Sequence, residues 1–252
     1  MIHFVGAGPG DPDLITVRGR DLLAQADTVI YAGSLVNPGL LSACRKDCAV
    51  FDSARMTLEE VIRTMEEAER EGRTTVRLHT GDPSLYGAIR EQMDALDARG
   101  ISYDVTPGVS SFCGAAAALG TEYTLPGISQ SVIITRMEGR TPVPKKERIE
   151  SFAEHGATMV IFLSTGLLGR LTEKLTEGGY APDTPAAIVY KATWPDEKVI
   201  RCTVGTLENA AAAEGIRKTA LIIVGKTVAQ GGYERSKLYD PSFTTEFREA
   251  KI

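Results

Sequence analysis

The chain has 252 residues, of which 43% are apolar and 24% charged, and its formal net charge is −5. This composition is typical of a globular protein with one large or two modest domains, and an acidic chain without a long lysine and arginine stripe argues against a nucleic-acid partner. No apolar run approaches the roughly 18 residues of a membrane span, and Met1 leads directly into a strand-like segment rather than a signal peptide, so we expect a cytoplasmic protein with no membrane partner.

The cysteines and histidines do not form a metal-binding pattern. The four cysteines are scattered, and the closest two, Cys44 and Cys48, have no histidine nearby. We interpret them as free buried thiols and expect no metal site. Among the histidines, only His79 adjoins a predicted ligand turn, where it is either a pocket residue or a core histidine.

In the first half of the chain, predicted strands and helices alternate. Buried, β-branched runs predict strands at residues 2–5, 28–31, 75–79 and 103–106, and helical spacing predicts helices at 18–26, 57–71, 84–98 and 110–119. Thr57 and Glu60 form a capping-box pattern at the start of the second helix, and Gly72 ends it. Strands that alternate with helices in this way predict a mostly parallel sheet.

Residues 120–130 are rich in turn formers and mark a predicted domain boundary. We therefore expect an α/β domain at 1–120, a second α/β domain at 121–240 and a tail at 241–252. The second domain is predicted to contain strands at 131–135, 158–163, 186–190, 198–204 and 220–225, and helices at 167–177 and 206–214. Two consecutive strands joined near Pro195 imply an antiparallel pair, so the second sheet is predicted to be mixed.

The most informative motif is TGDPSLYG at residues 80–87, between a predicted strand and a predicted helix. Ligands of open α/β sheets collect at such turns. Gly81 allows close backbone approach, Asp82 supplies a fixed negative charge, and Pro83 suits the first position of a helix. These residues suit a nucleotide-derived ligand with a positive charge, and a capped loop without a ligand is the alternative.

A second glycine-rich segment, GAGPGDPDLIT at residues 6–16, looks like a dinucleotide-binding fingerprint but lacks two of its features. The sixth position of the fingerprint is Asp11 rather than glycine, and the next predicted strand ends in Tyr31 and Ala32 rather than in an acidic residue. No GK[ST] phosphate loop and no GxSxG nucleophile motif occurs. The sequence therefore argues against a nicotinamide dehydrogenase, a P-loop NTPase and a serine hydrolase.

Four segments in order, GAGPGDPDLIT, TGDPSLYG, TPGVSS (106–111) and ALIIVGKTV (220–228), resemble the motifs of the tetrapyrrole methylase family across essentially the whole chain. The resemblance implies two α/β domains with an active-site cleft between them, S-adenosylmethionine as cofactor, a small-molecule tetrapyrrole as methyl acceptor, and a homodimer. YAGSLV (31–36), residues 110–136 and YERSKLYDP (233–241) are similar to the branch that methylates carbon 11 of precorrin-4 or cobalt-precorrin-4 in cobalamin synthesis.

Several alternatives stay open within and outside that family. The methylated position could be another ring carbon, and the substrate could carry cobalt or be metal-free. A diphthamide-type methyltransferase shares the fold but methylates a protein. A non-catalytic tetrapyrrole carrier would have no need of S-adenosylmethionine.

The resemblance also assigns cofactor contacts by position. In the first domain they fall on Pro9, Thr80, Gly81, Asp82, Leu85, Tyr86, Ser110 and Ser111. In the second domain they fall on Leu163, Ser164, Ala192, Thr219 and Ala220, and relatives commonly have a methionine near Ser164. Three basic residues near the inferred cleft, Arg18, Arg136 and Lys191, are hypothesised partners of substrate carboxylates, with solvated surface cations as the alternative.

The implied reaction needs little acid or base chemistry from the protein. An electron-rich pyrrole-type carbon attacks the methyl group of a sulfonium in line, and the attacked carbon becomes quaternary and releases no proton. Holding the two reactants in line can lower the barrier by about 7–11 kcal/mol. We therefore assign no catalytic residue and interpret Asp82 as a cofactor-orienting carboxylate.

Overall fold

The computed structural model describes residues 1–229 and 231–250, and the chain forms two compact units. Unit 1 comprises Met1–Ala115 and Lys191–Glu197, and unit 2 comprises Ala116–Tyr190 and the residues from Lys198 onward. Each unit contains one five-stranded sheet, which confirms the predicted α/β class. The division falls inside the helix that the sequence predicts at 110–119, and a short segment from the second half of the chain belongs to unit 1.

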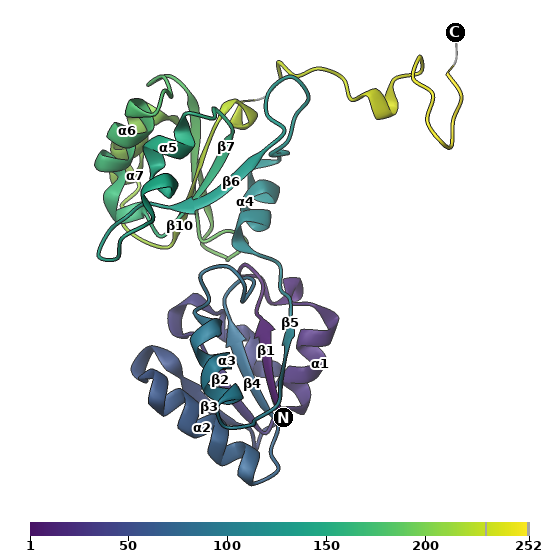
Figure 1. Cartoon of the computed structure of the whole chain (residues 1–252), viewed down its shortest axis with the longest axis vertical. Coiled ribbons are helices and arrows are strands. Elements are labelled where there is room, and N and C mark those ends of the chain that lie inside the picture. The colour runs from purple at the N-terminus through teal and green to yellow at the C-terminus, as the bar shows by residue number, and fades with distance from the viewer. Residues whose placement is uncertain (230, 251–252) are drawn as a thin grey trace. The chain divides into compact units, whose positions relative to one another are not determined.

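Unit 1 is built on a parallel sheet of strand order β3-β2-β4-β1-β5. Its strands are β1 (Ile2–Gly6), β2 (Thr28–Tyr31), β3 (Ala49–Asp52), β4 (Thr75–His79) and β5 (Tyr103–Thr106). Its helices are α1 (Val17–Gln25), α2 (Leu58–Arg70) and α3 (Ile89–Asp97), and α4 (Ser111–Leu119) follows β5 and continues into unit 2 (Figure 1).

Apolar side chains are buried on both faces of this first sheet. On one face, Val5 belongs to a cluster with Leu23 of α1. On the other face, Phe4 belongs to a cluster with Met65 of α2 and Leu96 of α3. A parallel sheet requires cover on both faces because its crossover helices pack against each of them.

The strand order creates a switch point between β1 and β4. The chain leaves the carboxyl end of β1 toward α1 on one face of the sheet, and it leaves the neighbouring β4 toward α3 on the other face. Where adjacent strands connect to helices on opposite faces, a crevice opens at the carboxyl ends, and ligands of open α/β sheets bind there. The loops at residues 7–16 and 80–88 therefore flank the expected ligand position.

Two parts of unit 1 differ from the prediction. The edge strand β3 was not predicted, since no residue in it is fully buried and the apolar pattern is correspondingly weak. The helix predicted at 84–98 begins only at Ile89, because the preceding residues form a turn in which Tyr86 and Ala88 have φ values of 56° and 50°. Pro83 lies in that turn, so its assignment to the first helical position was wrong.

Unit 2 contains a mixed sheet of order β6-β7-β10-β8-β9. Its strands are β6 (Val132–Arg136), β7 (Thr158–Phe162), β8 (Pro185–Tyr190), β9 (Lys198–Thr203) and β10 (Ala220–Val224). Strands β6 and β7 are parallel, and the other neighbours are antiparallel, including the β8–β9 pair that the sequence predicts.

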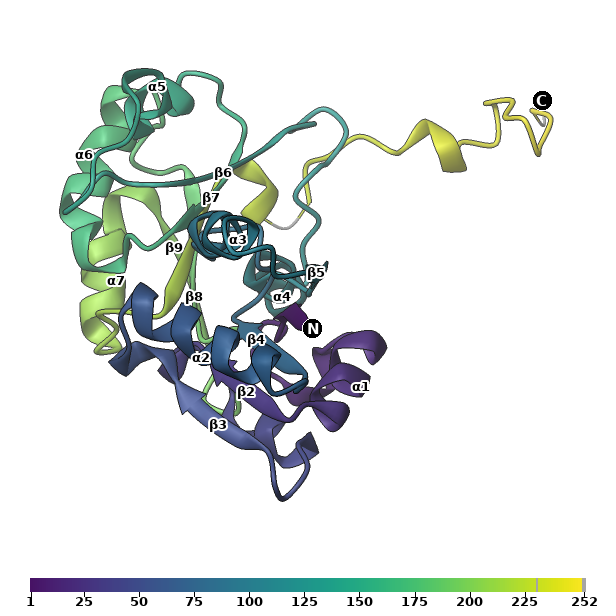
Figure 2. The ribbon, with the colours of Figure 1, turned by 60° about the horizontal axis from the view of Figure 1, so that its bottom comes forward.

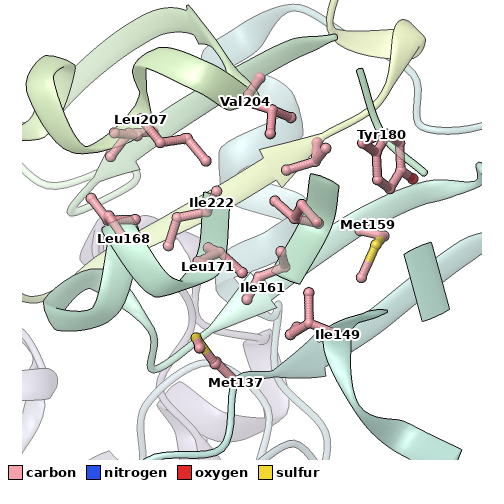
Figure 3. Close-up of a cluster of buried hydrophobic side chains, with 14 of the residues drawn as sticks. Met137, Ile149, Met159, Ile161, Leu168, Leu171, Tyr180, Val204, Leu207 and Ile222 are labelled. Carbon is pink, nitrogen blue, oxygen red and sulfur yellow. The ribbon is translucent and has the colours of Figure 1, made fainter. Parts of the chain in front are cut away.

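The core of unit 2 lies between its sheet and three helices. Helices α5 (Ile149–Ala153), α6 (Leu168–Glu177) and α7 (Leu207–Ala213) lie on one side of the sheet (Figure 2). Their apolar side chains pack on Met159, Ile161 and Ile222 of the central strands in one cluster of buried residues (Figure 3). Within the described residues, no helix combines the length and the apolar character needed to cross a membrane.

Candidate functional site

Three loops of unit 1 meet at the carboxyl edge of its sheet. They follow β1, β4 and β5, and β1 lies between the other two strands. The amide of Ala7 donates to the His79 carbonyl at 2.7 Å, and the amide of Gly81 donates to the Gly8 carbonyl at 2.9 Å. The segments GAGPGDPDLIT and TGDPSLYG, far apart in the sequence, are thus hydrogen-bonded to each other.

Glycines allow this close approach of three backbones. A Cβ atom added at Gly108 would lie 2.2 Å from the Gly81 carbonyl oxygen, and one added at Gly6 would lie 2.5 Å from the Gly108 Cα. Gly81 also has φ +59°, in the left-handed region that favours glycine. The glycine of TPGVSS was not singled out from the sequence, although its place in a motif was a usable signal.

Asp82 joins two of these loops through its carboxylate. Its Oδ1 accepts from the Ser84 amide at 2.9 Å and from the Ser84 hydroxyl, and its Oδ2 accepts from the Gly108 amide at 2.9 Å. Desolvation raises the pKa of Asp82, but these hydrogen bonds from Ser84 and Gly108 outweigh it and hold the pKa below its usual value. The carboxylate is therefore ionised and held at the expected ligand position.

The other predicted cofactor residues of unit 1 lie around this carboxylate or on the same loops. Thr80 and Leu85 are half-buried, Ser110 is buried beside the start of α4, and Ser111 is its first residue. Tyr86 is 45% exposed. Its backbone is in the left-handed region, which residues other than glycine rarely adopt. Pro9 is buried in the loop after β1.

A second group of predicted residues gathers at one edge of the sheet of unit 2. Strands β7 and β10 are antiparallel, so the end of β7 lies beside the start of β10, and the Thr165 hydroxyl donates to the Ala220 carbonyl at 3.1 Å. Leu163 and Thr219, at this edge, have φ values of 52° and 58°. Leu163 is 68% exposed, whereas Ser164 is fully buried.

Ser164 has a structural partner on the neighbouring strand connection. Its hydroxyl oxygen accepts from the Met137 amide at 2.9 Å and the hydroxyl donates to the Phe162 carbonyl at 2.7 Å. Ala192, the remaining predicted residue, is buried and belongs to the segment that packs in unit 1. The assignment of Leu163, Ser164, Ala192, Thr219 and Ala220 to the cofactor stays a prediction.

The three basic candidates all have partners inside their own units. Arg18 donates to the Asp104 carboxylate at 3.1 Å, and Lys191 donates to the Asp196 carboxylate at 2.6 Å. The Arg136 guanidinium donates to carbonyl oxygens of the loop that follows β6, at Met137, Thr141 and Pro142. Their role toward substrate carboxylates stays a hypothesis.

Two buried polar residues of β4 lie next to the site. The Arg77 guanidinium donates to the Gln92 side chain at 3.0 Å and to the Ile30 carbonyl at 3.1 Å, and burial lowers its pKa to about 10. Burial, helped by the positive charge of Arg77, lowers the pKa of His79 to about 3. The His79 ring stacks on Phe4, and its Nε2 has no hydrogen-bond partner among the described residues. His79 is thus a neutral core histidine rather than a pocket residue.

The residues of unit 1 fit a sulfonium cofactor in charge. The ionised Asp82 carboxylate complements a positive charge, and the motif glycines bring three loops together around it. Tyr86 presents an aromatic side chain from a strained backbone, and such strain clusters at ligand sites. Across the part of the chain that the structure describes, no three metal-ligating side chains come together.

Comparisons with known proteins show which family the chain belongs to. The family model described as Tetrapyrrole (Corrin/Porphyrin) Methylases matches residues 1–208. The cobalt-precorrin-4 C(11)-methyltransferase of Methanocaldococcus jannaschii is 51% identical over 249 residues, which cover 99% of this chain and 96% of that protein.

Two solved structures share the fold. The X-ray structure of a cobalamin biosynthetic enzyme, cobalt precorrin-4 methyltransferase, matches with a TM-score of 0.89 and 48% identity, over 90% of this chain and 95% of that one. Uroporphyrin-III C-methyl transferase from Thermus thermophilus, complexed with S-adenosyl homocysteine, matches with a TM-score of 0.74 and 26% identity, over 90% of this chain and 92% of that one. The motif loops, the fold and the family model agree, and this chain belongs to the tetrapyrrole (corrin/porphyrin) methylase family.

Proposed function

We propose that this protein transfers a methyl group from S-adenosylmethionine to carbon 11 of precorrin-4 or cobalt-precorrin-4 in cobalamin synthesis. The observation that carries the proposal is the 51% identity to a cobalt-precorrin-4 C(11)-methyltransferase over 99% of the chain. The loop arrangement around Gly81 and Asp82 supports it, since the family motifs converge there.

The proposal for the cofactor rests on charge and on a relative. One relative of the same fold was solved with S-adenosyl homocysteine, the demethylated form of the methyl donor. When bound, S-adenosylmethionine supplies an electrophilic methyl group on a sulfonium. We assign its contacts in unit 1 to Pro9, Thr80, Gly81, Asp82, Leu85, Tyr86 and Ala192, with Ser110 and Ser111 at the start of α4.

In this proposal the chain acts by binding and orienting rather than by proton transfer. Asp82 is held by three donors, so its carboxylate does not have to reorganise when a cation arrives. The attacked ring carbon becomes quaternary, and no residue is needed to remove a proton from it. The contribution that we assign to the protein is therefore the alignment of donor and acceptor.

The test uses both forms of the acceptor. The protein is incubated with metal-free or cobalt-loaded precorrin-4 and S-adenosylmethionine carrying a ¹³C-labelled methyl group, and the labelled carbon is located by NMR. Label at carbon 11 supports the proposal, and the acceptor that is methylated faster shows whether the substrate carries cobalt. Label at another ring carbon would contradict the proposed position and indicate a methyltransferase for that carbon.

Binding calorimetry with the methyl donor and with the corrin precursor separates the remaining alternatives. A tetrapyrrole carrier would bind the acceptor but show no heat of S-adenosylmethionine binding in calorimetry. A diphthamide-type protein methyltransferase would bind the donor and no corrin precursor. We also propose a homodimer, as the family resemblance implies, and light scattering of the purified protein tests it.

A further inference from the structure

The segment Lys191–Glu197, here called the strap, connects β8 and β9 of unit 2 but packs in unit 1. There it contacts Pro9, Gly10 and Asp11 of residues 7–11, here called the opening loop, which follow β1. Neither Thr193 nor Trp194 of the strap was among the predicted site residues. The strap therefore adds side chains from the second half of the chain to the loops around the candidate site.

Two side chains of the strap hold the opening loop by hydrogen bonds. The Trp194 Nε1 donates to the Pro9 carbonyl at 3.2 Å, and the Thr193 Oγ1 accepts from the Asp11 amide at 3.0 Å. These bonds fix the peptide groups on both sides of Gly10. From another direction, the Asn37 side-chain amide donates to the Gly10 carbonyl at 2.8 Å.

The strap also fits the opening loop sterically. A Cβ atom added at Gly10 would lie 2.1 Å from Cδ1 of Trp194, so the indole occupies the space beside the glycine. A Cβ atom added at Gly114 of α4 would lie 3.0 Å from Pro9 and 3.1 Å from the Thr193 methyl group. The strap, the opening loop and the start of α4 are therefore packed without room for another carbon atom.

The strap is held in a strained conformation. Lys191 and Thr193 have φ values of 46° and 68°, and a β-branched residue is rarely found in this region. The Thr193 amide donates to the Glu197 carboxylate at 2.6 Å, and the Lys191 ammonium lies 5.1 Å from the centre of the Trp194 ring. Strain of this kind persists only where surrounding contacts fix it, and it clusters at functional sites.

We propose that Thr193 and Trp194 are positioning residues for methyl transfer, which hold the opening loop, with its predicted cofactor residue Pro9, at the ligand-binding edge of the sheet. The proposal rests on the proposed function. Through the Asp11 amide and the Pro9 carbonyl, the strap fixes the loop that follows the interior strand β1, at the edge where ligands of this fold bind. A loop that is already fixed loses less freedom when a ligand binds, so loosening it weakens binding.

The first test is steady-state kinetics of a pair of variants. Thr193→Val keeps the branched shape and removes the acceptor for the Asp11 amide, and Thr193→Ser keeps the acceptor. We expect Thr193→Val to raise the KM for S-adenosylmethionine about fivefold, the factor that corresponds to one neutral hydrogen bond, with kcat changed less than about twofold. Thr193→Ser should keep the wild-type KM.

The second test uses intrinsic fluorescence, because Trp194 is the only tryptophan of the chain. Gly10→Ala places a methyl group against the indole and is expected to shift the Trp194 emission in the ligand-free protein. Gly139→Ala is the matched control, since a Cβ atom there meets only Leu167, at the ordinary contact distance of 3.5 Å, and its emission should equal that of the wild type.

The outcomes separate this proposal from the proposed function. A wild-type protein that methylates no corrin precursor contradicts the function itself. An active wild type overturns the positioning role if Thr193→Val keeps its KM, if kcat alone falls, or if Thr193→Ser loses as much as Thr193→Val. If Thr193→Val does not fold, Trp194→Phe replaces it, and an unchanged KM in that variant overturns the proposal.

Discussion

At the scale of single residues, the site is organised by a side chain that accepts hydrogen bonds from the backbone. Both carboxylate oxygens of Asp82 accept from backbone amides, those of Ser84 and Gly108, so the charge is held in place before any ligand binds. His79, one position before the motif, is buried in its neutral form. These two residues differ in role although they are close in sequence, because one lies on a loop and the other in the sheet.

Replacement of Asp82 by asparagine tests the carboxylate bridge. An asparagine side chain has one acceptor oxygen and one donor group, so the amide of either Ser84 or Gly108 loses its acceptor. We expect the free energy of unfolding to fall by about 1–3 kcal/mol, measured by urea denaturation, and S-adenosylmethionine binding to weaken in calorimetry. Asp13→Asn, at an exposed position, is the control, and equal stability of both variants would contradict the bridge.

The stability of the protein near pH 5 reports on His79. Its pKa is about 3 in the folded protein and 6.5 when unperturbed, so between these values the unfolded chain binds a proton that the folded protein does not. Stability therefore falls as pH drops through this window, by at most about 1.4 kcal/mol per pH unit. His79→Leu should flatten the dependence, measured as the urea midpoint against pH. The exposed His155→Gln should not, and a common slope for both would sink the assignment.

At the scale of elements, strand ends and their loops carry the candidate site. The motif glycines pack three loops at one edge of the sheet of unit 1. In unit 2 the loop after β6 is held by two residues that the sequence assigned to ligands. Arg136 donates to its carbonyls, and Ser164 accepts from the Met137 amide.

The loop after β6 should depend on the planar guanidinium of Arg136. Arg136→Lys replaces several fixed donors with one flexible ammonium group, which cannot reach three carbonyls together. We expect the amides of residues 137–141 to exchange hydrogen faster and the protein to lose about 1–3 kcal/mol of stability. Hydrogen exchange with mass spectrometry measures the first effect. The exposed Arg140→Lys is the control, and unchanged protection in Arg136→Lys would show that the hydrogen bonds from Arg136 to the loop carbonyls are not needed to hold the loop.

At the scale of the whole molecule, each unit has its own hydrophobic core. Leu96 is buried in unit 1, and Leu171 is buried in unit 2. The chain passes between the units at residues 115–116, 190–191 and 197–198. Each unit therefore has a separate core, and the chain crosses from one unit to the other three times.

Core truncation in one unit should loosen mainly that unit. Leu171→Ala and Leu96→Ala each remove a fully buried side chain, at an expected cost of about 2–5 kcal/mol. We expect hydrogen exchange to accelerate in the strands of unit 2 for the first variant and in those of unit 1 for the second. Equal acceleration in both units for either variant would show instead that the molecule unfolds as one cooperative body.

The sequence by itself determined the local features of this protein. Strands such as 75–79 and the capping box of Thr57 and Glu60 were predicted correctly, since periodicity and capping depend on near neighbours. The family followed from motifs in order along the chain, and the mostly parallel and mixed sheets followed from the order of the predicted strands and helices. The turn before α3 was missed because two residues adopt left-handed backbone that no side-chain pattern announces.

Only the tertiary structure decided which distant groups meet. In the folded chain the Gly108 amide donates to Asp82, the Arg136 guanidinium donates to carbonyl oxygens, and Trp194 lies beside Gly10. The physical reason is that hydrogen bonding and steric fit between distant segments depend on how the strands are ordered and how loops cross. Residue types and spacing specify which groups can bond, whereas the folded backbone selects the partner.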